Sequence, residues 1–190
     1  MNTHRTHQLP SLPGLGGLLA LLLLATPSQG EQIYMTVNGS RQGTISSDAS
    51  SIDSLGQNAR PEHANKISVL AAEHLVNVPV DSATGQPIGR AVQRAYKVTT
   101  YMDSANPLLN KALNDAEILD LTIEFWRTGS GGSQEHYFTV TLDEAVLISS
   151  RTWAPNDPQN ETHAMVEYQF SYNSIDWSHE ISGTSASHGS

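Results

Sequence analysis

The feature that most constrains the fold of this chain is residues 118–150, where two runs of alternating hydrophobicity flank a turn. Every second side chain of the first run is apolar, and these side chains are Leu119, Leu121, Ile123 and Phe125. The second run repeats the alternation with Phe138, Val140 and Leu142. A two-residue period is typical of a strand with one buried face. Because residues 128–133 hold three glycines between the runs, the segment predicts a β-hairpin.

Shorter segments outside the hairpin also have strand patterns, and they are residues 33–37, 67–78, 90–101 and 163–177. One segment, residues 106–115, has a helical period instead, with Asn106 placed to cap the helix and Pro107 at its first position. These elements predict a mainly β fold, an antiparallel β-barrel or β-sandwich with one short α-helix over an open end or edge.

The chain divides into three parts. Residues 1–30 contain an apolar run followed by the small residues Ser28 and Gly30. This pattern predicts a secretory signal peptide cut before Glu31, or a misassigned start upstream of the protein. The apolar run is too short for stable insertion across a membrane, which takes about twenty residues. Residues 31–181 form the predicted folded domain, and residues 182–190, small and polar, are expected to be a flexible tail.

Composition excludes several classes of partner and chemistry. Ten Lys and Arg against nineteen Asp and Glu give a net charge of −9, which argues against nucleic acid as a partner. The chain has no cysteine, so disulfides, thiolate metal sites and cysteine nucleophiles are excluded. A length of 190 residues is typical of a single domain with a sizeable core.

No catalytic, cofactor-binding or metal-binding residue can be named. The histidines of the domain are scattered without the spacing of a metal motif, so we expect structural roles for them. Asp143 and Glu144 are neighbouring carboxylates, but a strand points them to opposite faces, and a bulge or turn in an edge strand is the simpler interpretation. The glycine-rich turn is not followed by a helical pattern, which argues against a phosphate-binding loop.

Residues 40–65 are rich in Ser, Asp, Gly and Asn and poor in apolar residues, so they predict a long surface loop that projects from the barrel. A loop of this length in a compact domain is often functional. It carries charges of both signs, namely Arg41, Asp48, Asp53, Arg60 and Glu62. Mixed charges of this kind can set the orientation of a polar interface while adding little stability.

The order of features along the chain resembles a known family. The features are an opening strand and turn at 33–43, a histidine-bearing strand end and turn at 74–89, a Ser-x-x-Pro-Leu helix start at 104–108, and long strands at 119–127, 137–142 and 146–149. Taken together over residues 33–177, they resemble the haemolysin-coregulated protein (Hcp) family, the tube subunit of the type VI secretion system.

The resemblance implies a compact β-barrel that assembles as a homohexameric ring. Rings stack into a hollow tube that a contractile sheath drives out of the cell. The implied partners are copies of the chain itself, the sheath, the tip spike protein and small effector proteins held in the lumen. No enzyme activity is implied. The extended loop of the family is associated with ring stacking, which assigns residues 40–65 to contacts between stacked rings.

The resemblance also implies secretion from the cytoplasm without a signal peptide, which agrees with a misassigned start; a genuine leader would instead make the protein periplasmic or exported by the general pathway. Two other function classes stay open from the sequence. One is an exported monomeric β-sandwich that binds a ligand or acts as an adhesin. The other is an effector enzyme, which the absence of a catalytic constellation disfavours.

Overall fold

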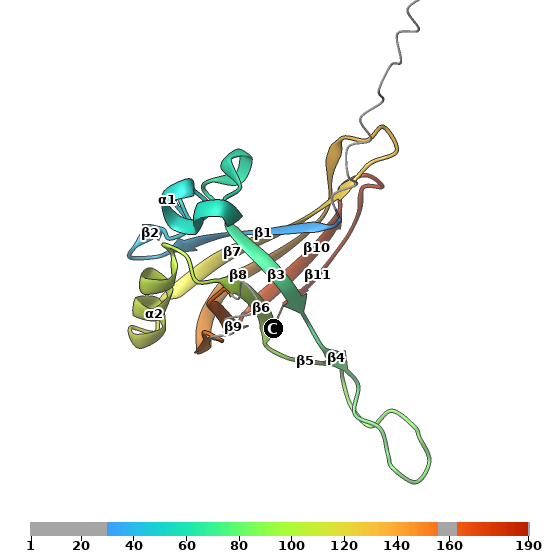
Figure 1. Ribbon diagram of the computed structural model, residues 1–190. Helices are drawn as coiled ribbons and strands as arrows, with labels where there is room; N and C mark the ends of the chain where they lie inside the picture. Colours follow the sequence, from blue (N-terminus) through green and yellow to red (C-terminus); the bar gives the residue numbers. More distant parts are fainter. Residues whose placement is uncertain (1–29, 156–162, 190) are drawn as a thin grey trace, which may run out of the picture.

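The computed structural model of the protein describes residues 30–155 and 163–189 (Figure 1). Its strands are β1 (Gln32–Gly39), β2 (Gly43–Thr44), β3 (Ile67–Glu73), β4 (Val76–Asn77), β5 (Val92–Gln93), β6 (Tyr96–Tyr101), β7 (Ile118–Thr128), β8 (Gln134–Trp153), β9 (Met165–Ser171), β10 (Ser174–His179) and β11 (Thr184–Gly189). Its helices are α1 (Ile52–Leu55) and α2 (Asn106–Asn114), with short 3-10 helices η1 (Gly56–Asn58) and η2 (Pro61–His63). The predicted leader falls on residues 1–29, which lie outside the described residues.

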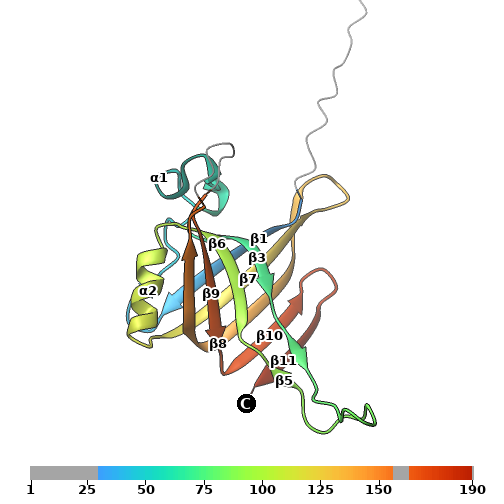
Figure 2. The same ribbon diagram turned by 60° about the horizontal axis from the view of Figure 1, so that its bottom comes forward.

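The main sheet closes into a barrel. Its strand order is β11-β10-β8-β7-β1-β3-β6-β9, and β9 pairs again with β8. All of these pairings are antiparallel. The β10–β11 hairpin continues the sheet beyond the closed barrel, as Figure 2 shows. The predicted mainly β, antiparallel fold is confirmed, and its form is a barrel.

Barrel closure depends on the length of β8 and on a bulge within it. The first part of β8 pairs with β7 on one side and β10 on the other, whereas the part from Val146 to Trp153 pairs with β9. The change of partner follows a register shift at Asp143 and Glu144, where Glu144 has a φ of 47°. The predicted bulge is present, but β8 is not an edge strand, because it is paired on both sides there.

The predicted hairpin supplies much of the core. Leu119, Leu121 and Ile123 of β7 are fully buried, and Phe125 packs partly buried against them. The turn between β7 and β8 is closed by the N–H of Gly129, which donates to the carbonyl of Ser133 at 2.8 Å. Buried residues alternate in the same way along β6 and β9. The period-two patterns therefore predicted the faces of these strands correctly.

Helix α2 confirms the predicted helix, but its cap differs from the prediction. Asn106 lies inside the helix, and Ala105 is the capping residue, without a side-chain cap bond. The side chain of Asn106 instead donates to the hydroxyl of Tyr168 at 2.7 Å. The carboxylate of Asp103 accepts the N–H of Ala105, just before the helix. The local sequence favours Asn106 as the helix cap, but its side chain binds the buried Tyr168 of β9 instead.

The predicted flexible tail is wrong for residues 184–189. These residues form β11, which pairs with β10 along its whole length, from His179 opposite Thr184 to Ser174 opposite Gly189. The free edge of β10 supplies backbone partners that the composition of the tail does not reveal. No helix in the described part of the chain is long and apolar enough to cross a membrane.

Candidate functional site

Residues 40–65, predicted as a projecting loop, instead fold against the barrel. The segment contains β2, α1, η1 and η2, none of which was predicted. Ile45, Ser46, Ala49 and Ser50 are all buried. The hydroxyl of Ser50 donates to the carbonyl of Lys66 at 2.6 Å, so burial of this polar side chain is compensated. The expectation of a poor core element is corrected: the segment packs through small residues that carry their own hydrogen bonds.

The five charged residues assigned to ring stacking all keep exposed side chains on this folded segment: Arg41, Asp48, Asp53, Arg60 and Glu62. None of the four ion pairs found among the described residues joins two of them. The two arginines donate hydrogen bonds to backbone carbonyls, Arg41 to Asp115 and Arg60 to Ala59.

Glu117 fixes the start of the segment. Its carboxylate accepts the backbone N–H groups of Arg41 and Gln42 at 2.6 and 2.8 Å, and the side-chain amide of Gln42 at 2.7 Å. The Arg41 guanidinium donates to the carbonyl of Asp115 at 2.8 Å. Burial alone would raise the pKa of Glu117, but these hydrogen bonds outweigh it and lower the pKa below its ordinary value.

Contacts between tilted aromatic rings fix the end of the segment. The ring of His63 lies 3.9 Å from that of Tyr34 and 5.0 Å from that of Trp126, measured between centroids. Lys66 forms a 2.5 Å ion pair with Glu124, which also accepts the indole N–H of Trp126. Burial, together with the nearby Lys66, lowers the pKa of His63. The expected structural role of this histidine fits the contacts, since it docks the segment on β1 and β7.

A different segment projects from the barrel, and the sequence interpretation missed it. Residues 75–94, which we call the arm, contain β4 and β5 and extend away from the barrel at the end opposite α1 and α2 (Figures 1 and 2). No residue of the arm is buried. Six of its apolar side chains are exposed: Leu75, Val76, Val78, Val80, Ile88 and Val92. The alternation of Val76, Val78 and Val80 around Pro79 was the available signal, because proline is confined to unpaired strand edges.

The foot of the arm is held by His74. The Nε2 of His74 lies 2.6 Å from the hydroxyl of Tyr172, and its ring stacks on that of Tyr96 at 5.4 Å. Burial lowers the pKa of His74. The N–H of Arg94 donates to the carbonyl of Leu75 at 3.0 Å and closes the base of the arm. The direction of the arm is therefore set where it leaves the barrel.

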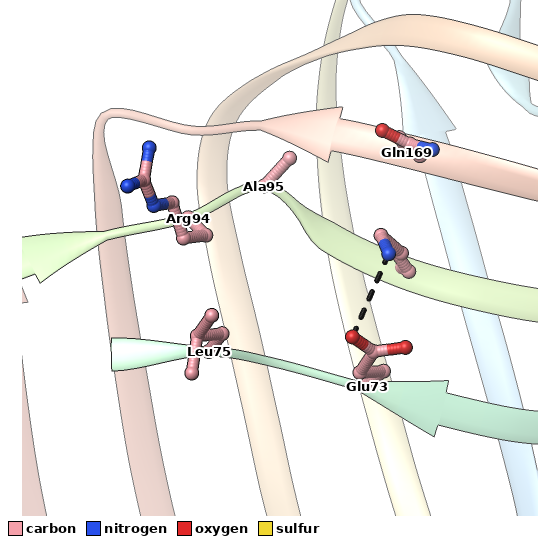
Figure 3. Close-up of a pocket in the computed structure, with 6 residues that line it drawn as sticks. Glu73, Leu75, Arg94, Ala95 and Gln169 are labelled. Carbon is pink, nitrogen blue, oxygen red and sulfur yellow. Dashed lines mark ion pairs between the residues drawn. The ribbon is translucent and has the colours of Figure 1, made fainter. Parts of the chain in front are cut away.

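An open pocket of about 310 Å³ lies beside this foot. It is lined by Glu73, Leu75, Arg94, Ala95, Lys97 and Gln169 (Figure 3). Glu73 and Lys97 form an exposed ion pair of 3.5 Å across it. The described residues include no group of three side chains able to hold a metal ion. The pocket lining therefore combines charged and apolar side chains, and it includes no Ser, Thr or His side chain.

Comparison with known proteins identifies relatives over most of the chain. Residues 34–179 match the model of a family described as "Type VI secretion system effector, Hcp". The "Major exported protein" of Pseudomonas aeruginosa is 37% identical over 169 residues, which cover 86% of this chain and 95% of that protein.

Solved structures agree with this match. A crystal structure of an Hcp protein has 32% identity and a TM-score of 0.79, covering 84% of this chain and 99% of that chain. The secreted protein Hcp3 from Pseudomonas aeruginosa has 32% identity and a TM-score of 0.71, covering 84% of this chain and 97% of that chain.

Proposed function

Because this chain belongs to the Hcp family of type VI secretion proteins, we propose that it is a tube-forming subunit whose hexameric rings stack into a hollow tube. The alternative of a monomeric adhesin-like β-sandwich finds no support in its relatives. The observation that carries the proposal is that family membership is joined to a barrel with two unlike ends, one bearing the arm and the other bearing α1 and α2.

Two unlike ends suit head-to-tail stacking. In a stack of identical rings, the arm of one subunit faces the opposite end of a subunit in the next ring. That opposite end carries the 40–65 segment with its exposed Ile52. The exposed valines and isoleucine of the arm gain by burial against such an apolar residue, at about 25 cal/mol per Å² of apolar surface. We therefore place the ring-stacking contact between the arm and the 40–65 segment.

Charge supports this pairing. The arm carries Arg90 and Arg94 against Asp81, a net charge of +2 − 1 = +1. The 40–65 segment carries Arg41 and Arg60 against Asp48, Asp53 and Glu62, a net charge of +2 − 3 = −1. Opposite signs at two facing surfaces fix their orientation and speed their encounter more than they strengthen the contact. In this proposal the five charged residues of the 40–65 segment remain ring-stacking residues, and they lie on the surface that contacts the arm of a subunit in the next ring.

The other partners follow from the tube role. A tube of this kind is bound by a contractile sheath and a tip spike protein, and its lumen holds small effector proteins. The subunit itself acts structurally in this proposal and not as an enzyme. Its location is extracellular after secretion, in keeping with a relative named as an exported protein. We propose that residues 1–30 are absent from the working subunit, and an intact mass that includes this leader in tube-assembled protein would overturn that point.

The arm is tested by two charge-introducing substitutions, Val80→Asp and Ile88→Asp, on side chains that are 56% and 65% exposed. The expected result is a ring that stays hexameric by light scattering while tubes vanish by electron microscopy and secretion stops. Ile181→Asp is the matched control, because Ile181 is 57% exposed on the β10–β11 turn. Tubes that form normally with both arm substitutions would contradict the arm contact.

The receiving side is tested by charge reversal. Asp53→Arg with Glu62→Arg should weaken stacking, and adding Arg90→Glu with Arg94→Glu should restore it, since the signs are then exchanged on both surfaces. If stacking is lost in the first variant and the added arm substitutions do not restore it, the 40–65 segment is not part of the ring-stacking contact. A native chain, starting at Glu31, that stays monomeric at high concentration would overturn the tube function itself.

A further inference from the structure

Residues 52–63 lie on the outside of the barrel beside β1 (Figure 1). They form α1, η1 and η2, and none of them is buried. The residues just before them are anchored differently, because Ile45 and Ala49 lie in the core. A surface stretch without buried side chains is held by a small number of specific contacts and opens at low cost. The docking of residues 52–63 on the barrel therefore depends strongly on those contacts.

His63 makes such a contact with the barrel. Its imidazole lies against the rings of Tyr34 in β1 and Trp126 in β7, at 3.9 and 5.0 Å between centroids. Tyr34 is 2% exposed, so the contact reaches the body of the barrel. Towards the other end of the stretch, the hydroxyl of Ser54 accepts the N–H of Ser104 at 2.8 Å. Loss of the His63 contact would therefore free the end of the stretch that lies on β1 and β7.

The surroundings of His63 disfavour a positive charge on its ring. Burial and the ammonium group of Lys66 lower the pKa of His63, whereas the carboxylates of Glu124 and Glu62 act in the opposite direction. Glu124 is already engaged, because it pairs with Lys66 at 2.5 Å and accepts the indole N–H of Trp126 at 3.0 Å. Glu62 is exposed, so water and salt screen its charge. Neither carboxylate is therefore a strong partner for a protonated His63.

The other titratable or charged groups at this contact supply no negative charge. They are Tyr34 in β1, Arg60 beside it, and His136 in β8, which stacks on Trp126 at 5.2 Å. Burial raises the pKa of Tyr34, which keeps its hydroxyl neutral. Arg60 is itself a cation. A proton on His63 would thus add a positive charge to a half-buried contact that already has Lys66 and Arg60 around it.

We propose that residues 52–63 dock on β1 and β7 while the imidazole of His63 is neutral, and are released when it is protonated. A solvated histidine has a pKa of about 6.5, and the docked one has a lower pKa. At pH 7.5 the ring is neutral in both states, so docking has its full strength. Below about pH 6.5 the released state binds the proton more readily than the docked state, so docking weakens as the pH falls.

The consequence for assembly rests on the proposed function. The stretch that is released carries Ile52, Asp53 and Glu62, which belong to the surface assigned above to ring stacking. Acid should therefore loosen the stacking of rings at a pH at which the barrel itself is still folded. Tubes assembled at pH 7.5 should dissociate at pH 5.5, as measured by sedimentation, whereas tubes of a His63→Phe variant should persist.

Hydrogen exchange measures docking without assembly, on the full chain at a concentration at which light scattering shows no tubes. Protection factors, corrected for the pH dependence of intrinsic exchange, should fall at least about threefold for residues 52–63 between pH 7.5 and pH 5.5 and stay unchanged in β7. His63→Phe keeps an aromatic ring without the titrating group, so its protection should not change with pH. His136→Phe, the matched control, removes the other histidine that contacts Trp126 and should keep the threefold fall.

A second measurement needs no substitution. The NMR titration of the His63 ring in the natural protein should have a midpoint below 6.5, and the amide signals of residues 52–63 should shift with the same midpoint. Equal protection at both pH values, a fall that persists in His63→Phe, a fall abolished by His136→Phe, or a midpoint of 6.5 or above would each overturn the proposal. A chain that forms no tubes at any pH contradicts the proposed function, whereas exchange and titration still decide whether His63 controls docking.

Discussion

The Oε1 atom of Glu117 lies 2.6 Å from the backbone nitrogen of Arg41, a residue 76 positions earlier in the chain. This bond ties the β1–β2 turn to the segment that joins α2 and β7. It also fixes the backbone from which the Arg41 side chain is presented. A buried carboxylate with several N–H donors is stable only while all of its partners stay in place.

Glu117→Gln should lower the free energy of unfolding by roughly 2 kcal/mol, because charge-assisted hydrogen bonds become neutral and the new amide group faces N–H donors. The loss is measured by denaturant unfolding. Glu62→Gln, an exposed carboxylate of η2, is the control and should change stability by under about 0.5 kcal/mol. Since the pKa of Glu117 is lowered in the folded protein, its contribution is present above about pH 4.5 and is lost as the pH falls further. Equal stability of the two variants would show that the carboxylate clamp is dispensable.

Gly39→Ala should also destabilise the protein, by roughly 1 to 3 kcal/mol, because overpacking displaces a neighbour. A Cβ at residue 39 would lie 2.6 Å from Oε1 of Glu117, whose own bonds resist a shift. Gly131→Ala meets nothing within 4 Å and serves as the control. In the Glu117→Gln background the cost of Gly39→Ala should shrink, since the clamp is already weakened, and strictly additive costs would argue against the coupling.

Core truncations should follow burial. Phe170→Ala removes a side chain with 0% exposure and should cost roughly 3 to 5 kcal/mol, while Val140→Ala, at 3% exposure, should cost roughly 2 kcal/mol or more. Phe125→Ala should cost less than Phe170→Ala, because Phe125 is only partly buried and stacks edge to face on Phe138. Denaturant midpoints give the order. A larger loss of stability for Phe125→Ala than for Phe170→Ala would contradict the deeper burial of Phe170 in the barrel interior.

The contribution of Asp103 to the free energy of unfolding should become less favourable as the pH rises. Burial raises the pKa of Asp103 to about 7, partly offset by the N–H groups of Ala105 and Asn106. Its Oδ2 is buried without a partner among the described residues. The folded protein therefore binds this proton more tightly than the unfolded chain, so the favourable contribution is full below about pH 4 and is lost as the pH rises through 7.

Asp103→Asn keeps an oxygen for the N–H of Ala105 but removes the proton. The stability of this variant relative to the natural protein should rise between about pH 5 and pH 8. Urea unfolding at a series of pH values measures the difference. Parallel stability curves for the two proteins would contradict a raised pKa at this position.

The sequence predicted those elements that depend on residues close together in the chain. Alternation in β7 and β8 requires only neighbours two positions apart, and the turn requires only the glycines of residues 128–133. Helix α2 likewise followed from a local apolar stripe. The family could also be recognised, since the order of these elements is carried by the sequence itself and its match is confirmed.

Tertiary structure decided which of the remaining residues are buried. Ile45 and Ala49 are isolated in a serine-rich stretch, and they enter the core because Ser46 and Ser50 find hydrogen-bond partners on neighbouring strands. Val78 and Val80 have a strand pattern, yet they stay exposed because, among the described residues, the small β4–β5 sheet of the arm pairs with no strand of the barrel.

The sequence by itself determined the antiparallel β class, the central hairpin, helix α2 and the family of the chain. Only the tertiary structure decided that residues 75–94 project while residues 40–65 pack, and that the small polar residues 184–189 form a strand. The reason is physical: periodicity reports local geometry, whereas burial and pairing depend on partners such as Glu117 and Arg41, or β10 and β11, that meet only after the barrel has closed.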